Sequence, residues 1–338
     1  MSCTSAPSTV AKKCETLLSK CEIPIIDLGH MGLERCPQKG VVKQVASKLV
    51  RALSEKGLAF IVNHGIPDCK MKAVYRALDE FCVLPADSRA KYECVAPSSH
   101  GYVKPEVEDP SSPADKEARH AFIITGDTEV LPEDEVPGFR AAVEELSRDF
   151  KQLSGMLLQA LSVGLEQPPE FLPSKHAHML KEGNETALRL LYYPPSGVVE
   201  SSLTHYGARC DYGTFTLLAQ DRESGLEIQT LSGGRWERVG HLTGAILIKT
   251  GDKLASWTNQ QFQTLKHRIV VPEQYGRGRH SIAFFVHPDK DTTIEPLETK
   301  IATASGQEPV LCRMEKKKRG VMTAYHHLQR RFRETYAS

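Results

Sequence analysis

Short apolar runs separated by turn-forming residues fill the second half of the chain, from residue 186 onward. Each run is four to eight residues long, and Gly225 and Gly240 mark two of the turns. Apolar and polar residues alternate in Leu226-Glu227-Ile228-Gln229, as in a strand with one buried face. The runs are ALRLLYY, TFTLLA, LEIQT, RWERV, AILIKT, KHRIVV and SIAFFV. Many short strands at regular spacing predict a sandwich or barrel, here a jelly roll.

The first half of the chain has the longer period of amphipathic helices. Apolar residues recur at helical spacing over 41–53, 71–81 and 139–161, and the last of these predicts the longest helix. Gly57 stands where a glycine ends the first helix, and the apolar run 58–65 predicts a strand directly after it. We therefore expect a mainly β protein with flanking helices, in which an N-terminal α/β scaffold region precedes a jelly-roll (double-stranded β-helix) core.

These patterns divide the chain into four expected parts. They are a flexible arm over 1–22, a scaffold region of helices and strands over 23–165, the jelly-roll core over 183–290 and a C-terminal helical extension over 291–338. The segment 104–115 is rich in Pro, Ser and Asp, and is either a lid over a binding site or an ordinary loop insertion. Residues 313–334 hold eight Lys or Arg against two Glu, which is typical of a solvated helix face and less often of a nuclear signal.

Composition limits the function classes. The chain has 43 Lys and Arg against 42 Asp and Glu, so no strong field favours nucleic acid, and a small-molecule substrate is the expected partner. Nine scattered cysteines without a Cys-x-x-Cys pair argue against a disulfide framework and for a reducing compartment. No stretch has the length and apolar character of a signal peptide or a membrane span. We expect a cytoplasmic monomer with no membrane contact.

Five residues of the predicted strands carry candidate chemistry. Residues two apart in a strand share a face, so Arg209 and Asp211 point the same way, as do Arg279 and Ser281. An Arg on an inward face needs an anion, either a bound carboxylate or an internal Asp or Glu. His267 alone is more often a core residue than a metal ligand, and Asp211 alone could belong to a turn. Together they give two thirds of the facial triad of non-haem iron oxygenases.

Several further short motifs follow one another along the chain. They are IPIIDL over 23–28, GLAFIVNHGI over 57–66, LP over 84–85, RLLYYPP over 189–195, GTFTLL over 213–218, GD over 251–252 with WTN over 257–259, and FFVHPD over 284–289. In this order, and together with Asp211, His267 and Arg279-His280-Ser281, they resemble the iron(II)/2-oxoglutarate-dependent dioxygenases. The likeness is to the isopenicillin N synthase-like branch, and it extends over most of the chain.

The resemblance implies both an activity and a site. Asp211 and His267 would ligate iron, and Arg279 with Ser281 would hold the far carboxylate of 2-oxoglutarate. Tyr193 would touch the same cosubstrate. The implied protein is an oxidoreductase that uses Fe(II) and 2-oxoglutarate to hydroxylate or desaturate a small organic substrate, with release of succinate and CO2.

Arg209 departs from the family pattern, in which the remaining iron ligand is a His two residues before the Asp. Arginine has no lone pair to donate, and its charge repels a divalent cation. Cys210 faces away from Asp211. His205 could take the place of the missing histidine ligand only through a bulge or a register slip. Two protein ligands with a chelating 2-oxoglutarate could retain iron, or Arg209 could pair with Asp211. The alternative function is a catalytically impaired relative that binds a small dicarboxylate or acts as an interaction module.

Two other motifs, one His-x-Asp and one His-x-His, have spacings that suggest metal binding. His287-Pro288-Asp289 has the His-x-Asp spacing, but it follows the Arg279 strand and matches a different element of the family. His176-Ala177-His178 has no evident carboxylate partner, so we expect it to lie in a surface loop.

Overall fold

The structure is a computed structural model, and it describes residues 17–18, 22–33, 39–95, 99–105, 119–126, 130–194, 204–221, 225–230, 234–271, 278–297 and 322–336. Within the expected arm 1–22, only Leu17–Leu18 and Glu22 are among them. Residues 106–115 of the predicted loop and residues 313–321 of the basic segment lie outside the described residues.

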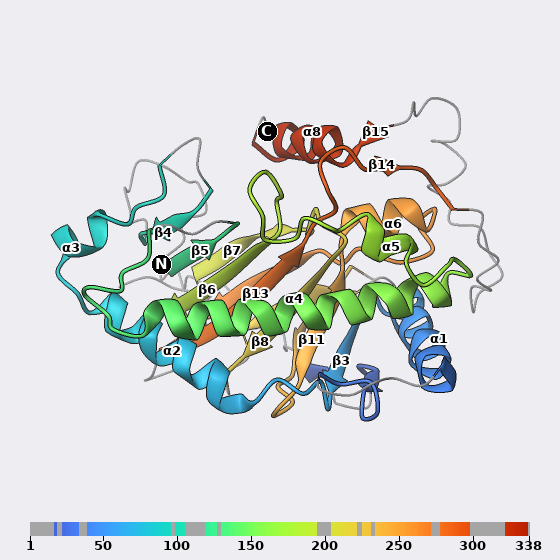
Figure 1. The fold of residues 1–338 in the computed structure, drawn as a ribbon, viewed down its shortest axis with the longest axis horizontal. Coiled ribbons are helices and arrows are strands. Elements are labelled where there is room, and N and C mark those ends of the chain that lie inside the picture. Colours follow the sequence, from blue (N-terminus) through green and yellow to red (C-terminus); the bar gives the residue numbers. More distant parts are fainter. Residues whose placement is uncertain are drawn as a thin grey trace, which may run out of the picture.

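Two β-sheets form the centre of the fold (Figure 1). The larger has eight strands, in the order β2 (Ile25–Asp27), β3 (Leu58–Val62), β11 (Ile246–Thr250), β8 (Phe215–Gln220), β13 (Arg279–Val286), β6 (Ala187–Tyr193), β5 (His120–Ile124) and β4 (Gly101–Val103). The smaller has five, in the order β1 (Leu17–Leu18), β10 (Trp236–Val239), β9 (Leu226–Gln229), β12 (His267–Val271) and β7 (Thr204–Arg209). All seven predicted runs are strands, and the mainly β fold is confirmed.

Helices from the first half of the chain cover one face of the larger sheet. They are α1 (Lys39–Glu55), α2 (Asp68–Cys82) and α4 (Phe139–Gly164), and α4 crosses in front of β6, β13, β8 and β11 in Figure 1. The rings of Phe150 and Phe284 lie 5.6 Å apart and join α4 to β13. The first helix ends as predicted, because Gly57 adopts a φ of 73° that a residue with a side chain rarely takes.

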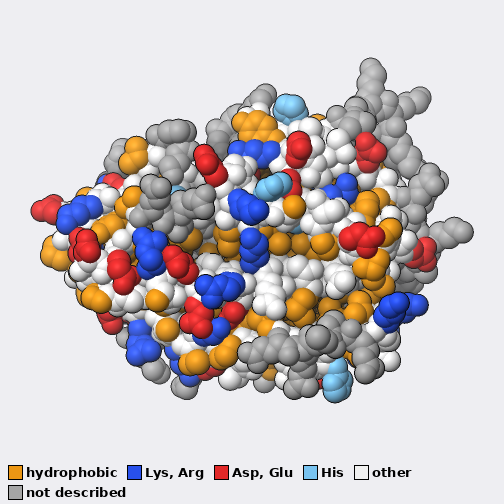
Figure 2. Space-filling view, viewed as in Figure 1, with side chains coloured by type: hydrophobic (Ala, Val, Ile, Leu, Met, Phe, Trp, Pro, Cys, Tyr) orange, Lys and Arg blue, Asp and Glu red, His pale blue; other side chains and the backbone are white. Residues whose placement is uncertain are grey.

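Shorter elements complete the described part of the chain. They are α3 (Ala86–Ala90), α5 (Phe171–Ser174), α6 (Asp252–Trp257), α8 (Ala324–Tyr336) and the two-stranded pair of β14 (Thr293–Ile294) with β15 (Met322–Thr323). On the face shown in Figure 2, basic and acidic side chains are interspersed and no broad area carries a single sign. This agrees with the formal net charge of +1.

The larger sheet separates two apolar cores. Leu217 and Ala219 of β8 belong to the outer core, which the sheet shares with the helices. Leu218 belongs to the inner core, together with residues of the smaller sheet such as Ile228 and Ile269. Alternation along a single strand therefore decides whether a side chain supports the helical layer or faces the space between the sheets. The candidate site residues use the inward face.

The outer core contains an aromatic cluster centred on Phe81 of α2, which is fully buried. Its ring lies 5.1 Å from that of Tyr102, 5.3 Å from that of Phe122 and 6.2 Å from that of Phe139. We expect Phe81→Ala to lower the free energy of unfolding by about 3–5 kcal/mol, because it removes apolar contacts and leaves a cavity. Urea unfolding followed by circular dichroism measures this change.

Val95→Ala is the control for this prediction. Val95 is 70% exposed, so its truncation should change the free energy of unfolding by no more than about 0.5 kcal/mol. Equal effects of the two substitutions would contradict the assignment of Phe81 to the core.

Candidate active site

Asp211 lies in a turn between β7 and β8, two residues beyond the end of β7. The first residues of α6 hold the backbone of this turn. The amide of Asp252 donates to the carbonyl of Asp211 at 2.8 Å, and the amide of Lys253 donates to that of Gly213 at 3.0 Å. The packing is close, since a Cβ on Gly251 would come within 2.3 Å of the Gly213 carbonyl oxygen. The carboxylate is therefore placed by a fixed turn and not by regular strand geometry.

The carboxylate of Asp211 is buried and engaged on both oxygens. Oδ2 accepts a hydrogen bond from Thr216 Oγ1 at 2.7 Å and lies 3.0 Å from Lys249 Nζ. Oδ1 lies 3.4 Å from His267 Nε2. We call Arg209, Asp211, Thr216, Lys249 and His267 the Asp211 cluster. The structure thus brings together the Asp and the His that the sequence pairs, with a lysine beside them.

Sequence reasoning missed Lys249. It lies in β11 opposite Thr216 of β8, and only 4% of its surface is exposed. Leu247, two residues earlier on the same strand, belongs to the inner core, so Lys249 also points between the sheets. One signal was available in the sequence, because AILIKT places a single charged residue within an apolar run. Such a residue needs a buried partner of opposite charge.

The charges in this cluster set its protonation. Burial alone would raise the pKa of Asp211, but the positive charge of Lys249 and the contacts with His267 and Thr216 outweigh burial. The pKa of Asp211 is consequently held well below its ordinary value. Burial lowers the pKa of His267 to about 4, and the charge of Lys249 adds to this effect. At pH 7 the carboxyl group of Asp211 is therefore ionised and the imidazole of His267 is neutral.

Arg209 is the cross-strand neighbour of His267. Its positive charge also lowers the pKa of His267, so the two side chains are electrostatically close. The ladder between β7 and β12 has the irregularity that a bulge produces, but the backbone of His205 pairs with Val270, three residues beyond His267. At about 3.3 Å per residue, His205 therefore lies roughly 10 Å along the strand from the position opposite His267. The bulge does not move His205 into the position of Arg209.

A second group of polar residues lies on the inward face of the larger sheet. Arg279 is 1% exposed, and its Nη2 donates to Gln220 Oε1 at 2.8 Å. Its guanidinium lies 4.8 Å from the centre of the Tyr193 ring. Ser281, also 1% exposed, pairs across the ladder with Gln220. We call Tyr193, Gln220, Arg279 and Ser281 the Arg279 cluster. It joins the three predicted cosubstrate residues with Gln220, which sequence reasoning did not single out.

His280 lies between Arg279 and Ser281 in the sequence and points to the opposite face of the sheet. Its Nε2 lies 2.6 Å from Asp79 Oδ1 of α2, and its Nδ1 lies 3.4 Å from Asp221 Oδ2. Its ring stacks on Tyr192 with 4.8 Å between centroids. Burial alone would lower the pKa of His280, but hydrogen bonds and charge from Asp221 and Asp79 outweigh it and raise the pKa.

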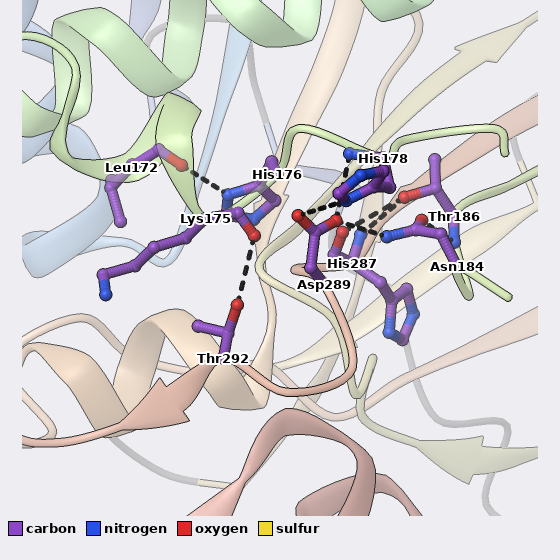
Figure 3. A network of polar contacts seen from close by, with 9 residues as sticks. All are labelled: Leu172, Lys175, His176, His178, Asn184, Thr186, His287, Asp289 and Thr292. Carbon is purple, nitrogen blue, oxygen red and sulfur yellow. Dashed lines mark hydrogen bonds and ion pairs between the residues drawn. The ribbon is translucent and has the colours of Figure 1, made fainter.

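The His-x-Asp motif at 287–289 and the His-x-His motif at 176–178 belong to one structural network (Figure 3). The expectation of a surface loop is wrong for His176, which is 2% exposed and bonds to Thr214 Oγ1 at 2.7 Å. His178 is exposed, yet its Nδ1 lies 2.9 Å from Asp289 Oδ2. Asp289 also accepts a hydrogen bond from Asn184 Nδ2 at 3.1 Å. His287-Pro288-Asp289 therefore fastens the chain before β6 to the end of β13.

Comparisons with known proteins agree over most of the chain. Residues 184–288 match the model of the 2OG-Fe(II) oxygenase superfamily, and residues 23–136 match that of the non-haem dioxygenase in morphine synthesis N-terminal region. The 2-oxoglutarate-dependent dioxygenase htyE of Aspergillus rugulosus is 30% identical over 282 residues, which are 74% of this chain and 83% of that protein. The chain belongs to the 2OG-Fe(II) oxygenase superfamily.

A second relative supports this family membership, and a solved structure supports the fold. The proline hydroxylase buaE of Petromyces alliaceus is 30% identical over 310 residues, which are 85% of this chain and 92% of that protein. The crystal structure of a 2OG-Fe(II) oxygenase family protein from Caulobacter crescentus superimposes with a TM-score of 0.76 at 24% identity, over 93% of this chain and 99% of that one. The resemblance inferred from the sequence and its jelly-roll fold are confirmed.

The principal functional prediction is confirmed at the level of the family. This oxygenase family consists of 2-oxoglutarate- and Fe(II)-dependent dioxygenases, and its substrates are typically small molecules. The comparisons do not favour the alternative of a catalytically impaired relative that binds a small dicarboxylate or acts as an interaction module. Among the described residues, no helix combines the length and the apolar composition that crossing a bilayer requires.

The residues of this oxygenase do not fit iron in the manner of the family. Arg209 offers no lone pair, and the carboxylate of Asp211 already faces the ammonium of Lys249. Within the described part of the chain, no three His, Cys, Asp or Glu side chains gather as metal ligands would. The Arg279 cluster, in contrast, fits a carboxylate, because a buried guanidinium and a hydroxyl can both donate to it.

The raised pKa of His280 predicts a pH-dependent stability. The imidazolium and its two carboxylates stabilise the fold below the unfolded pKa of about 6.5, and this contribution disappears as the pH rises through the folded value. Raising the pH from about 6 to about 9 should lower the free energy of unfolding of wild type by up to about 1 kcal/mol more than it lowers that of His280→Gln. Urea unfolding at each pH measures the difference.

His326→Gln removes an exposed histidine of α8 and serves as the control. It should keep the wild-type dependence of stability on pH. The same pH dependence in wild type and His280→Gln would show that the two carboxylates do not hold the imidazolium.

Proposed function

We propose that this oxygenase-family protein binds 2-oxoglutarate through the Arg279 cluster and recognises a small organic molecule as its second ligand. The burial of Arg279 on the inward face carries the proposal. Its Nη2 donates to Gln220 Oε1 at 2.8 Å, and Ser281 lies two residues away on the same face of β13. A guanidinium and a hydroxyl on one buried face offer several hydrogen-bond donors to a carboxylate.

The shape of the Arg279 cluster suits one carboxylate of a dicarboxylic acid. The planar guanidinium can give two parallel hydrogen bonds, which match the two oxygens of a carboxylate. Tyr193 lies against the guanidinium at 4.8 Å and restricts its orientation, and the bond to Gln220 fixes one end. A preset arginine loses little conformational entropy when the ligand arrives. Arg279 and Ser281 are thereby assigned to the far carboxylate, and Tyr193 to contact with the ligand.

The other untested parts of the prediction are proposals of the same kind. We assign the cosubstrate site to the core 183–290 and the helical wall behind it to the scaffold 23–165, because α2 and α4 pack on the strands that carry Arg279 and Ser281. Cys69 and Cys82 are free thiols, and we propose a cytoplasmic location, where thiols stay reduced. We further propose that it is a monomer and has no nucleic-acid partner.

Arg279→Gln tests the ligand site. We expect 2-oxoglutarate to raise the melting temperature of wild type in a saturable manner, because a ligand that binds only the folded state stabilises it. Loss of the charge-assisted hydrogen bonds, each worth about 1.5–3 kcal/mol, should weaken binding by at least about tenfold in the variant. Thermal-shift titrations give the two dissociation constants.

Arg51→Gln is the matched control, because Arg51 lies on α1 with a side chain that is 78% exposed. It should retain the wild-type response to 2-oxoglutarate. An unchanged melting temperature of folded wild type up to millimolar 2-oxoglutarate, about 1–10 mM, would refute the proposed function.

A further inference from the structure

Lys249 supplies a positive charge beside Asp211, the carboxylate that the family resemblance makes an iron ligand. Its Nζ lies 3.0 Å from Asp211 Oδ2, and the exposed fractions of the two side chains are 5% and 6%. A buried ion pair of this kind persists because separating the two charges would leave each one buried, without water and without its partner. Thr216 binds the same carboxylate oxygen at 2.7 Å and limits its rotation.

A metal ion and this ammonium would compete for the same carboxylate. A divalent cation beside Asp211 would also lie beside Lys249, and like charges a few ångströms apart repel strongly where water is excluded. Lys249 cannot easily withdraw to solvent, because it is part of a buried strand between β3 and β8. Arg209, opposite His267, adds a second cation and removes the third donor.

We propose that the ε-ammonium of Lys249 is the permanent counter-cation of Asp211, and that the Asp211 cluster holds no divalent metal. Asp211 and His267 then serve as the partners of an internal cation instead of as ligands. The positive charge that a bound metal ion supplies in family members is supplied in this protein by one of its own side chains.

The proposal has a consequence for the ligand, and this part rests on the proposed function. Thr216 and Gln220 lie four residues apart on the inward face of β8, so their Cα atoms are about 13 Å apart. Lys249 lies beside the first and Ser281 beside the second. The space between the sheets thus has a lysine at one end and Arg279 at the other. A dicarboxylate can bind between two such cations without metal, and EDTA should leave the effect of 2-oxoglutarate unchanged.

Manganese binding gives a readout that is independent of catalysis. We would titrate Mn²⁺ into the full-length protein and follow free Mn²⁺ by electron paramagnetic resonance, for wild type, Arg209→His, Lys249→Asn and the double variant. Wild type should show no saturable binding. The double variant, which restores a third donor and removes the ammonium, should bind at least about a hundredfold more tightly than either single variant.

Several outcomes would overturn the proposal. Saturable, one-to-one Mn²⁺ binding by wild type would do so, as would a folded double variant that binds Mn²⁺ no better than wild type. If the double variant does not fold, R209H combined with K249Q is measured in its place. Failure of 2-oxoglutarate to bind would refute the proposed function and leave the manganese result to be judged by itself.

A second cycle tests the ion pair directly. Asp211→Asn and Lys249→Met should each lower the melting temperature, because each leaves one buried charge without its partner. The combination of the two should regain most of the loss. Additive losses would show that Lys249 is not the counter-cation of Asp211. Arg51→Gln with Asp211→Asn is the control pair, and its effects should be additive.

Discussion

The buried contact between Asp211 and Lys249 is the constraint on which the rest of the site depends. It joins the turn after β7 to β11 of the larger sheet, so it fixes the approach of the two sheets at that end. The turn is itself held by α6, through amides that bond to the carbonyls of Asp211 and Gly213. The charge pair is therefore connected to both sheets and to α6 through hydrogen bonds of the turn.

The two faces of β13 link the inner site to the helical layer. Arg279 and Ser281 point between the sheets, whereas His280 points outward and meets Asp79 of α2. A strand can serve both faces because successive side chains alternate. The position of α2 is thus coupled, through a single residue, to the strand that carries the arginine. Helix α2 therefore supports, from the outer face of the sheet, the strand that carries Arg279 and Ser281.

Much of this fold could be predicted, because its signals are local. The seven strand runs, the three helices and the end of α1 at Gly57 follow from the pattern of apolar residues and one glycine. That Arg279 and Ser281 share one face of their strand follows from alternation alone. The neighbourhood of Lys249 could not be predicted in this way, because Asp211 meets it only through pairing between distant strands. His176 was misjudged for the same reason, since its partner Thr214 lies 38 residues away.

Arg209 and Lys249 lie on different sheets, and both bring positive charge to the same pair of side chains, Asp211 and His267. A neutral residue at position 249 alone would leave Asp211 buried with no ammonium beside it. A histidine at position 209 alone would create a donor set that still contains the lysine. The effect of a substitution at either position therefore depends on the residue at the other, so the two positions are coupled although they lie far apart in the sequence.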